Sequence, residues 1–232
     1  MSREPREVAD GVYQFPVLGA QAWLLLDEPV TLVDTGTRGG GRAIWRALER
    51  LGRRPEDLST VVLTHYHPDH LGALPELLSM RQAPLRVAIH AAEAPFLQRP
   101  AALPNPFQTR LLRALAQPLW PLARLRRPCA VHAALVDRGA VPGRPDVQVV
   151  HMPGHTPGSI ALHLPRHGLV LAGDAFERRA GRLGPPSTEF TEDRAAAWAS
   201  IRRLAALEFD TLCLSHFPPL RRRAAAAVRS LL

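Results

Sequence analysis

The 232-residue chain has the composition of an ordinary globular protein, and its length is sufficient for one substantial hydrophobic core. Hydrophobic residues make up 46% and charged residues 22%, which excludes extensive disorder. The formal net charge is +8, but all 29 basic residues are arginine and they are spread along the chain. Because nucleic-acid-binding proteins concentrate their basic residues in one patch, we predict no nucleic-acid partner.

The N-terminus and the cysteines bear on the cellular compartment. Residues 1–10 alternate arginine and glutamate without an apolar stretch, and no apolar run in the chain is long enough to cross a bilayer. Cys129 and Cys213 are the only cysteines, too few for a disulfide framework. We therefore expect a cytoplasmic protein without a transmembrane segment, in which Cys213 packs as a small hydrophobic residue.

Strands and helices alternate in the first and last thirds of the chain. Apolar runs predict strands at 11–17, 22–26, 30–34, 60–63, 86–89, 147–150, 160–164, 169–172 and 211–214. Apolar residues at helical spacing predict helices at 42–51, 71–78, 193–207 and 220–232. This order is typical of an α/β (α+β) protein with two β-rich layers faced by helices.

Residues 92–145, between these two parts, are rich in Pro, Arg, Ala and Leu. We predict a helical insertion there, within one domain that spans 1–232. Its segment 107–125 has an amphipathic pattern of leucines flanked by arginines. Three roles remain open: a packed insertion, a cap over an active site, or a membrane-surface helix. If it is a cap, we expect Arg110 and Arg113 to receive an anionic substrate tail.

The stretch Thr-His-Tyr-His-Pro-Asp-His, residues 64–70, concentrates four side chains that can bind metal directly after an apolar run. His65 and His67 can point to the same side, because alternate residues of an extended segment share a face. Asp69 and His70 follow Pro68, where the chain turns, and can reach a second position nearby. Imidazole and carboxylate groups are donors that zinc prefers, so the stretch predicts a pair of metal ions.

Three further candidate ligands also follow apolar runs, which are expected to end at one edge of the sheets. These are His155 in Pro-Gly-His-Thr-Pro-Gly-Ser, Asp174 after Gly173, and His216 after Ser215. Asp34 is either a carboxylate that fixes the loops of the site or a turn cap. The remaining histidines are expected to be structural at 90, 151 and 163, and to lie in exposed loops at 132 and 167.

The order of these motifs, from His65-x-His67-x-Asp69-His70 to Gly-Asp174 and His216, resembles the metallo-β-lactamase fold superfamily. The resemblance covers residues 32–216 except the insertion, and it implies a four-layer αββα sandwich. It also implies that His65, His67 and His155 hold one zinc ion, that Asp69, His70 and His216 hold another, and that Asp174 bridges them. Iron or manganese would be compatible with the same nitrogen and oxygen donors.

Two departures from the family pattern stand close to these residues. Leu71-Gly72-Ala73 replaces the usual Gly-Gly pair after the first motif, and His216 lies in Ser-His-Phe-Pro-Pro. The first departure leaves the ligands unchanged. The second places two prolines after His216, which are expected to stiffen its loop.

The resemblance implies a hydrolase in which a dinuclear zinc-bound hydroxide attacks a carbonyl carbon, with Asp69 orienting the nucleophile or moving its proton. The motifs around His155 and Asp174 look closest to the glyoxalase II-like and lactonase-like branches, which act on thioesters and lactones. We therefore expect a small-molecule hydrolase of a thioester, lactone or related carboxylic ester. The alternatives are a phosphodiesterase or ribonuclease of the same superfamily and a low-turnover metal-binding scaffold.

Overall fold

The computed structural model describes residues 4–80, 83–99, 103–118, 120 and 128–232. Its first sheet is formed, in spatial as well as chain order, by β1 (Arg6–Ala9), β2 (Val12–Pro16), β3 (Gln21–Leu25), β4 (Val30–Val33), β5 (Leu58–Val62), β6 (Arg86–His90) and β7 (Ala133–Leu135). The second sheet contains β8 (Ala140–Val141), β9 (Arg144–His151), β10 (Ile160–Leu164), β11 (Leu169–Leu171), β14 (Thr211–Cys213) and β15 (Leu220–Arg221). Its spatial order is β15-β14-β11-β10-β9-β8.

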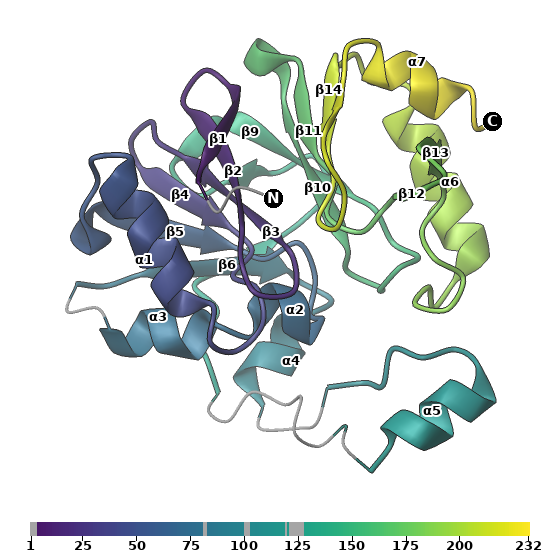
Figure 1. Ribbon diagram of the computed structural model, residues 1–232, viewed down its shortest axis with the longest axis horizontal. Helices are drawn as coiled ribbons and strands as arrows, with labels where there is room; N and C mark the ends of the chain where they lie inside the picture. The colour runs from purple at the N-terminus through teal and green to yellow at the C-terminus, as the bar shows by residue number, and fades with distance from the viewer. Residues whose placement is uncertain (1–3, 81–82, 100–102, 119, 121–127) are drawn as a thin grey trace.

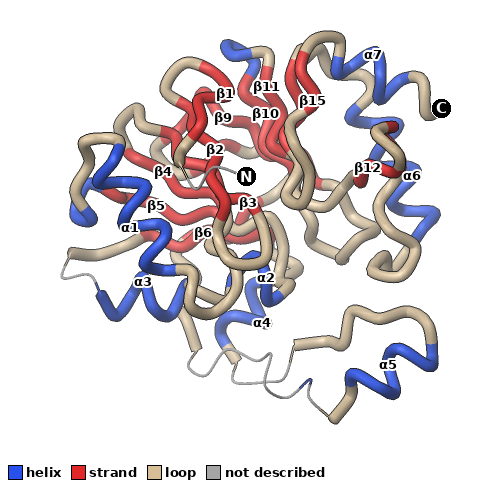
Figure 2. Tube along the Cα trace, viewed as in Figure 1, coloured by secondary structure: helices blue, strands red, loops and turns tan. Residues whose placement is uncertain are grey.

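Helices cover the outer face of each sheet. The α-helices are α1 (Gly41–Arg50), α2 (Pro68–Leu71), α3 (Leu74–Met80), α4 (Ala94–Gln98), α5 (Arg110–Ala116), α6 (Arg194–Leu204) and α7 (Ala224–Arg229). In Figures 1 and 2, α1 and α3 flank the first sheet while α6 and α7 flank the second. A short hairpin of β12 (Glu177–Arg179) and β13 (Arg182–Gly184) stands apart from both sheets. This arrangement confirms the predicted αββα sandwich.

The alternation of side chains along each strand separates the hydrophobic core into three layers. In β3, Trp23 and Leu25 pack between the two sheets, whereas Leu24 packs beneath α1 and α3. In β10, Leu162 lies between the sheets and Ala161 faces α6 and α7. Strands that are buried on both faces explain why the sequence shows continuous apolar runs rather than a strict polar alternation.

The predicted strands all occur, with ends that agree to within three residues, but two predicted helices differ from the structure. The helix expected at 71–78 is divided into α2 and α3. The division falls at Gly72 and Ala73, between the end of α2 and the start of α3. The backbone of Arg38 approaches the chain closely at this point, since a Cβ on Gly72 would lie 2.7 Å from the Arg38 nitrogen. The helix expected at 220–232 shrinks to α7, because Leu220 and Arg221 pair with β14 first. Arg222 and Arg223 then adopt positive φ angles of 65° and 55°.

The helical insertion expected at 92–145 is narrower in the structure. Helices α4 and α5 occupy part of it, whereas β7 joins the first sheet and β8 and the start of β9 join the second. Three residues of a sheet edge cannot be recognised from a pattern as short as Ala133–Leu135. Of the amphipathic segment 107–125, residues 119 and 121–125 lie outside the described residues.

The strand ends bring the four candidate ligand segments together. Residues 64–70 follow β5, the loop 152–159 follows β9, Asp174 follows β11 and His216 follows β14. Two backbone hydrogen bonds join the sheets at this edge: the Ile160 amide donates to the Thr64 carbonyl at 3.0 Å, and the Gln21 amide to the Ser215 carbonyl at 2.8 Å. Within the described part of the chain, no helix has the length and hydropathy needed to cross a bilayer.

Candidate metal centre

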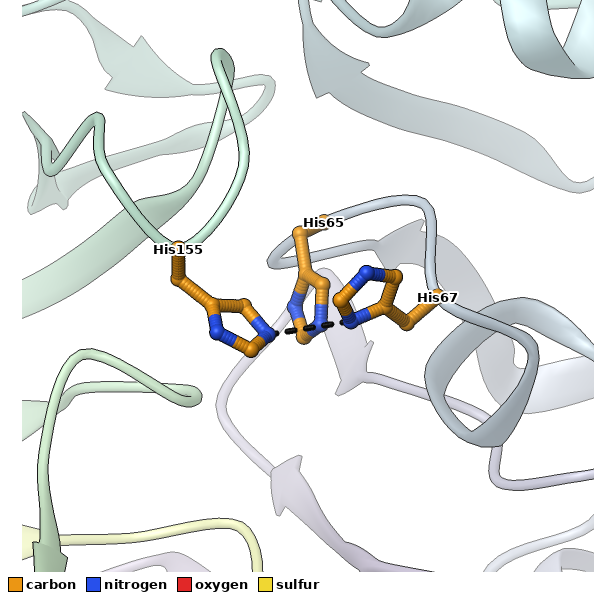
Figure 3. Close-up of side chains that lie close together, drawn as sticks. All are labelled: His65, His67 and His155. Carbon is orange, nitrogen blue, oxygen red and sulfur yellow. Dashed lines mark hydrogen bonds between the residues drawn. The ribbon is translucent and has the colours of Figure 1, made fainter. Parts of the chain in front are cut away.

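Three histidines from two loops form the first group of candidate ligands. Figure 3 shows the rings of His65 and His67, from the loop after β5, converging on His155 from the loop after β9. One donor atom of each lies within 4.8 Å of those of the other two, and His155 Nε2 is 2.9 Å from His67 Nδ1. All three side chains are buried. Three imidazole nitrogens therefore point at one small volume.

Burial keeps these three histidines neutral. It lowers the pKa of His65 and of His67 well below the usual value for histidine, and it lowers the pKa of His155 as well. The neighbouring imidazoles act in the same direction on His65, because positive charges so close together repel one another. A neutral imidazole keeps the lone pair that a metal ion needs, so this group is suited to binding a metal near neutral pH.

Asp69, His70, Asp174 and His216 form the second group, again with donor atoms within 4.8 Å of one another. His216 Nε2 lies 3.2 Å from Asp174 Oδ2 and 3.3 Å from Asp69 Oδ2. His70 Nε2 lies 3.5 Å from Asp174 Oδ1. The helix α2 begins at Pro68, whose fixed φ suits the first helical position, and it carries both Asp69 and His70.

Asp174 lies between the two groups. Its Oδ2 is 3.5 Å from His155 Nε2 and 4.0 Å from His65 Nε2, in addition to its contact with His216. One carboxylate thus reaches histidines of both groups, as the sequence interpretation required of a bridging residue. His216, which lies in the Ser-His-Phe-Pro-Pro loop, is brought to the same place, and its side chain is 35% exposed.

The second group carries charge, in contrast to the first. Burial opposes protonation of His70, but the surrounding carboxylates, Asp174 above all, hold its pKa well above the usual value. Burial also opposes protonation of His216, yet hydrogen bonds to Asp174 and Asp69 raise its pKa to about 10. In turn, the two histidines outweigh the effect of burial on Asp174 and hold its pKa well below the usual range. These carboxylates therefore favour positive charge between them.

Several buried polar atoms in both groups lack a hydrogen-bond partner among the described residues. They are His65 Nε2, His67 Nε2, His70 Nε2, His155 Nδ1 and Asp174 Oδ1. A buried polar atom without a partner costs free energy, and such atoms rarely cluster without a ligand. Three of them, on His65, His70 and Asp174, are donor atoms that converge with the other ligands. The residues present therefore fit divalent metal ions.

Asp34 fixes the orientation of His70 and of the first loop. Its Oδ2 lies 2.8 Å from His70 Nδ1 and accepts a hydrogen bond of 2.8 Å from Thr64 Oγ1. Its Oδ1 accepts a further bond of 2.8 Å from the Thr64 amide. Asp34 is fully buried and adopts a positive φ of 61°. A carboxylate on the far nitrogen of a histidine selects the tautomer that leaves the other nitrogen free to bind.

Glu93 is a buried residue of the site that the sequence interpretation missed. It accepts hydrogen bonds from Thr156 Oγ1 and, at 3.0 Å, from the Gly158 amide, on the loop that carries His155. A side chain at 158 would collide with Glu93, which explains the glycine there. Burial raises the pKa of Glu93 to about 7, although these hydrogen bonds act in the opposite direction. Glu93 lies three residues after β6, so the strand-end criterion applied to β6 would have found it.

The two groups open onto a cavity of about 520 Å³. Five of the candidate ligands line it: His67, Asp69, His155, Asp174 and His216. Half of the other lining residues are aromatic: Phe107, Trp120, Phe176, Phe190 and Phe217. A cavity of this size is typical of a site for a small molecule.

Arg110 and Arg113, the expected substrate contacts, do not belong to the wall of this cavity. Both lie on α5, and Arg113 Nε donates a hydrogen bond of 2.8 Å to the Phe107 carbonyl oxygen. Arg113 thus holds the neighbouring chain, and a contact of either arginine with a substrate stays a prediction from the sequence. The insertion reaches the cavity through Pro106, Phe107 and Trp120 instead. A helical pattern alone does not tell which side of the insertion faces inward.

The other histidines stay outside the two ligand groups. The rings of His90 and His151 stack with centroids 4.0 Å apart, and His163 Nε2 lies 3.3 Å from a backbone oxygen. The ring of His132, although exposed, accepts a hydrogen bond of 3.1 Å from the Val87 amide. Cys213 is fully buried between the sheets, in agreement with its expected role as a small hydrophobic residue.

An αββα sandwich with clustered histidines and aspartates at its strand ends defines a class of metal-dependent hydrolases. The family model described as the metallo-beta-lactamase superfamily matches residues 16–216. The chain belongs to this superfamily, which confirms the family predicted from its motifs. The finer questions are the bond that is cleaved and the metal that is bound.

Three relatives illustrate the similarity. The chain is 33% identical to the probable metallo-hydrolase YflN of Bacillus subtilis, over 92% of this chain and 86% of the relative. It is also 33% identical to a hydroxyacylglutathione hydrolase of Cereibacter sphaeroides over 73% of its length, but spans about half (52%) of that protein. The solved structure of TTHA1623 in a di-iron-bound form superimposes with a TM-score of 0.68 at 25% identity, covering 93% of this chain and 96% of that one.

Proposed function

We propose that the protein hydrolyses a thioester, lactone or related carboxylic ester with two divalent metal ions, of which zinc is the first candidate. The observation that carries the proposal is the convergence of seven histidine and aspartate side chains in two adjoining groups, five of which line one cavity of about 520 Å³. The 33% identity with a hydroxyacylglutathione hydrolase supports a carbonyl substrate. A relative in a di-iron-bound form keeps iron as the second candidate.

In this proposal each group of ligands would hold one ion. The neutral trio His65, His67 and His155 would hold the first, and Asp69, His70 and His216 the second, while Asp174 would contact both. When bound, the two ions supply Lewis acidity and lower the pKa of water, which makes a hydroxide nucleophile available near neutral pH.

The chain's own residues orient the substrate and move the proton. Hydrolysis adds one water molecule across the C–S or C–O single bond: the carbonyl carbon gains the hydroxyl group, that bond breaks, and the thiol, or the alcohol end of an opened lactone, takes the proton. Asp69 lines the cavity, and the charges of His70 and His216 outweigh the effect of burial and lower its pKa. An ionised carboxylate at this position can accept a proton from the attacking water and pass it to the leaving group.

Buried carboxylates on both sides hold the ligands in place. Asp34 fixes His70 and the Thr64 backbone, while Glu93 fixes the loop of His155 through Thr156. The ligands would therefore keep their positions while the substrate binds and the product leaves. The cytoplasmic location, the single domain and the lack of a nucleic-acid partner stay predictions from the sequence.

The test is a panel of substrates given to zinc-loaded protein and to a chelated control. It contains a glutathione thioester, an acyl-homoserine lactone, a β-lactam and a phosphodiester, with initial rates as the readout. We expect chelator-sensitive turnover of a thioester or lactone, restored by added zinc. Cleavage of the phosphodiester alone would replace the proposal by a nuclease. If the protein retains bound metal but hydrolyses none of the four substrates, the result would favour a low-turnover metal-binding scaffold.

A further inference from the structure

The wall of the cavity is built from aromatic rings of three separate segments. Phe107 and Trp120 come from the insertion, Phe176 and Phe190 flank the β12–β13 hairpin, and Phe217 directly follows the ligand His216. The rings of Phe107 and Phe190 meet with centroids 5.3 Å apart. Any group that reaches the candidate metal centre through this cavity therefore passes between aromatic surfaces.

Hydrogen bonds fasten the insertion to the hairpin segment at this point. The Thr109 amide donates to Glu189 Oε1 at 2.9 Å, and its hydroxyl donates to Glu189 Oε2. The Gln108 amide donates to the Glu189 carbonyl oxygen at 2.9 Å. On the insertion itself, Trp120 Nε1 donates to the Leu103 carbonyl oxygen at 2.6 Å. Phe107 and Trp120 are thus held in position before a substrate arrives.

Such a wall is expected to favour substrates that bury a large apolar area against it. Each buried aromatic ring offers a large surface, and burial of one methylene group contributes about 0.8 kcal/mol, or roughly fourfold in affinity. Outside the candidate ligands, the described residues of the lining include no basic side chain that could pair with a glutathione carboxylate, and their one acidic residue, Glu177, is already paired with Arg179. A neutral hydrocarbon group fits this lining better than an anionic tail.

We propose that this aromatic wall is a subsite for the acyl group of the substrate, and that the enzyme prefers neutral thioesters or lactones with a long hydrocarbon acyl chain. The inference rests on the proposed function, and it narrows the substrate class. It replaces the anionic tail expected from Arg110 and Arg113 by an apolar group that Phe107, Trp120 and Phe190 surround.

The first test compares kcat/KM for acetyl, butyryl and hexanoyl thioesters of the neutral thiol N-acetylcysteamine on metal-loaded protein. We expect a rise on the order of 100-fold from acetyl to hexanoyl. In Phe107→Ala and Phe190→Ala this ratio falls about five- to tenfold, because each variant removes one ring of the wall. Leu115→Ala is the matched control, since Leu115 lies on α5 with its side chain 66% exposed and outside the cavity. Hexanoyl-glutathione is the anionic counterpart with the same acyl group.

The second test measures binding without turnover. Of the four tryptophans, Trp120 lines the cavity. We expect 1-hexanol to change the tryptophan fluorescence of the wild type with roughly tenfold higher affinity than 1-butanol. In Trp120→Phe, which keeps an aromatic ring, the fluorescence change is lost.

The two tests separate the inference from the proposed function. Thioester turnover that is independent of acyl length, or faster with hexanoyl-glutathione than with its neutral counterpart, overturns the subsite and leaves the hydrolase intact. Binding of 1-hexanol at Trp120 without hydrolysis of any thioester or lactone supports the apolar subsite and removes the proposed reaction. Equal affinity for the two alcohols overturns the subsite whatever the turnover.

Discussion

The two ligand groups of the candidate metal centre differ in charge and in exposure. The group of His65, His67 and His155 is buried and neutral because burial lowers the pKa of each ring. The group built around Asp69 and His216 is charged and partly open, with side chains 31% and 35% exposed. Asp174 contacts both groups.

This difference in charge and exposure suggests that the two groups have different roles. A buried group of neutral donors is preorganised to hold an ion tightly, since no donor has to lose a proton when the ion binds. The charged group must release protons from His70 and His216, whose pKa values are raised, but it reaches the substrate side of the cavity. We therefore expect the first group to dominate metal retention and the second to dominate turnover.

The largest effect is expected from Asp69→Asn. The amide keeps an oxygen donor near the second ion but cannot accept the proton, so kcat should fall by about 10²- to 10⁴-fold while most of the metal remains. Steady-state kinetics and elemental analysis of the same preparation measure both quantities. Asp10→Asn, on an exposed turn, is the control. Unchanged turnover would remove Asp69 from the mechanism.

A second prediction concerns the free energy of unfolding and tests Glu93, which holds the loop of His155 in the first group. Because the pKa of Glu93 rises from 4.5 to about 7 on folding, the protonated acid stabilises the native state at low pH. This contribution is complete below pH 4.5 and is lost as the pH rises through 7, with a total of about 3 kcal/mol.

Glu93→Gln should lack this pH dependence, because an amide does not titrate in the range. The free energy of unfolding of both metal-free proteins, measured with denaturant from pH 4.5 to 8, gives the comparison, and the shared histidines cancel in the difference. If the free energies of unfolding of the two proteins depend on pH in the same way, folding does not raise the pKa of Glu93 and the prediction is wrong.

Asp34→Asn should weaken the second group selectively. Asparagine tolerates the positive φ at this position but loses the charge that orients His70, so affinity for the second ion should fall about 10- to 100-fold. Competition with a chelator, followed as two separate steps of metal release, measures the effect. An equal loss of both ions would contradict the separation of the two groups.

The smallest effects are expected on α5. Arg110→Ala should change KM by less than about twofold, because the side chain is exposed and outside the cavity wall. Arg113→Ala should reduce kcat/KM for a hexanoyl thioester about fivefold, since it removes a hydrogen bond to the Phe107 carbonyl. A large rise in KM for Arg110→Ala that is confined to anionic substrates would restore the role first expected of it.

The candidate ligands could be predicted from the sequence because each follows an apolar strand. His155, Asp174 and His216 are far apart in the chain, but the ends of β9, β11 and β14 lie at one edge of the second sheet, next to the end of β5. The αββα layers followed from the same runs. Neither the candidate ligands nor the layers required knowledge of how the strands pair with one another.

The remaining parts of the site take their roles from tertiary contacts, because a position after a strand marks Glu93 as a candidate but does not tell what it binds. Glu93 becomes a site residue only because the loop of Thr156 and Gly158 folds over it. The leucines and arginines of α5 formed a clear amphipathic pattern, yet the helix has no buried residue, and Phe107 before it lines the cavity. Periodicity identified the helix, but packing decided which residues face the substrate.

In the proposed function, the two groups bind two ions and the reaction requires both. The most direct measurement is a titration of metal-free protein with zinc, in which bound metal per chain and thioester or lactone turnover are recorded at each step. We expect a tight first ion with little turnover, then a weaker second ion whose binding brings the activity, and loss of both steps in Asp174→Ala. Full activity with one ion per chain, or activity in metal-free protein, would contradict it.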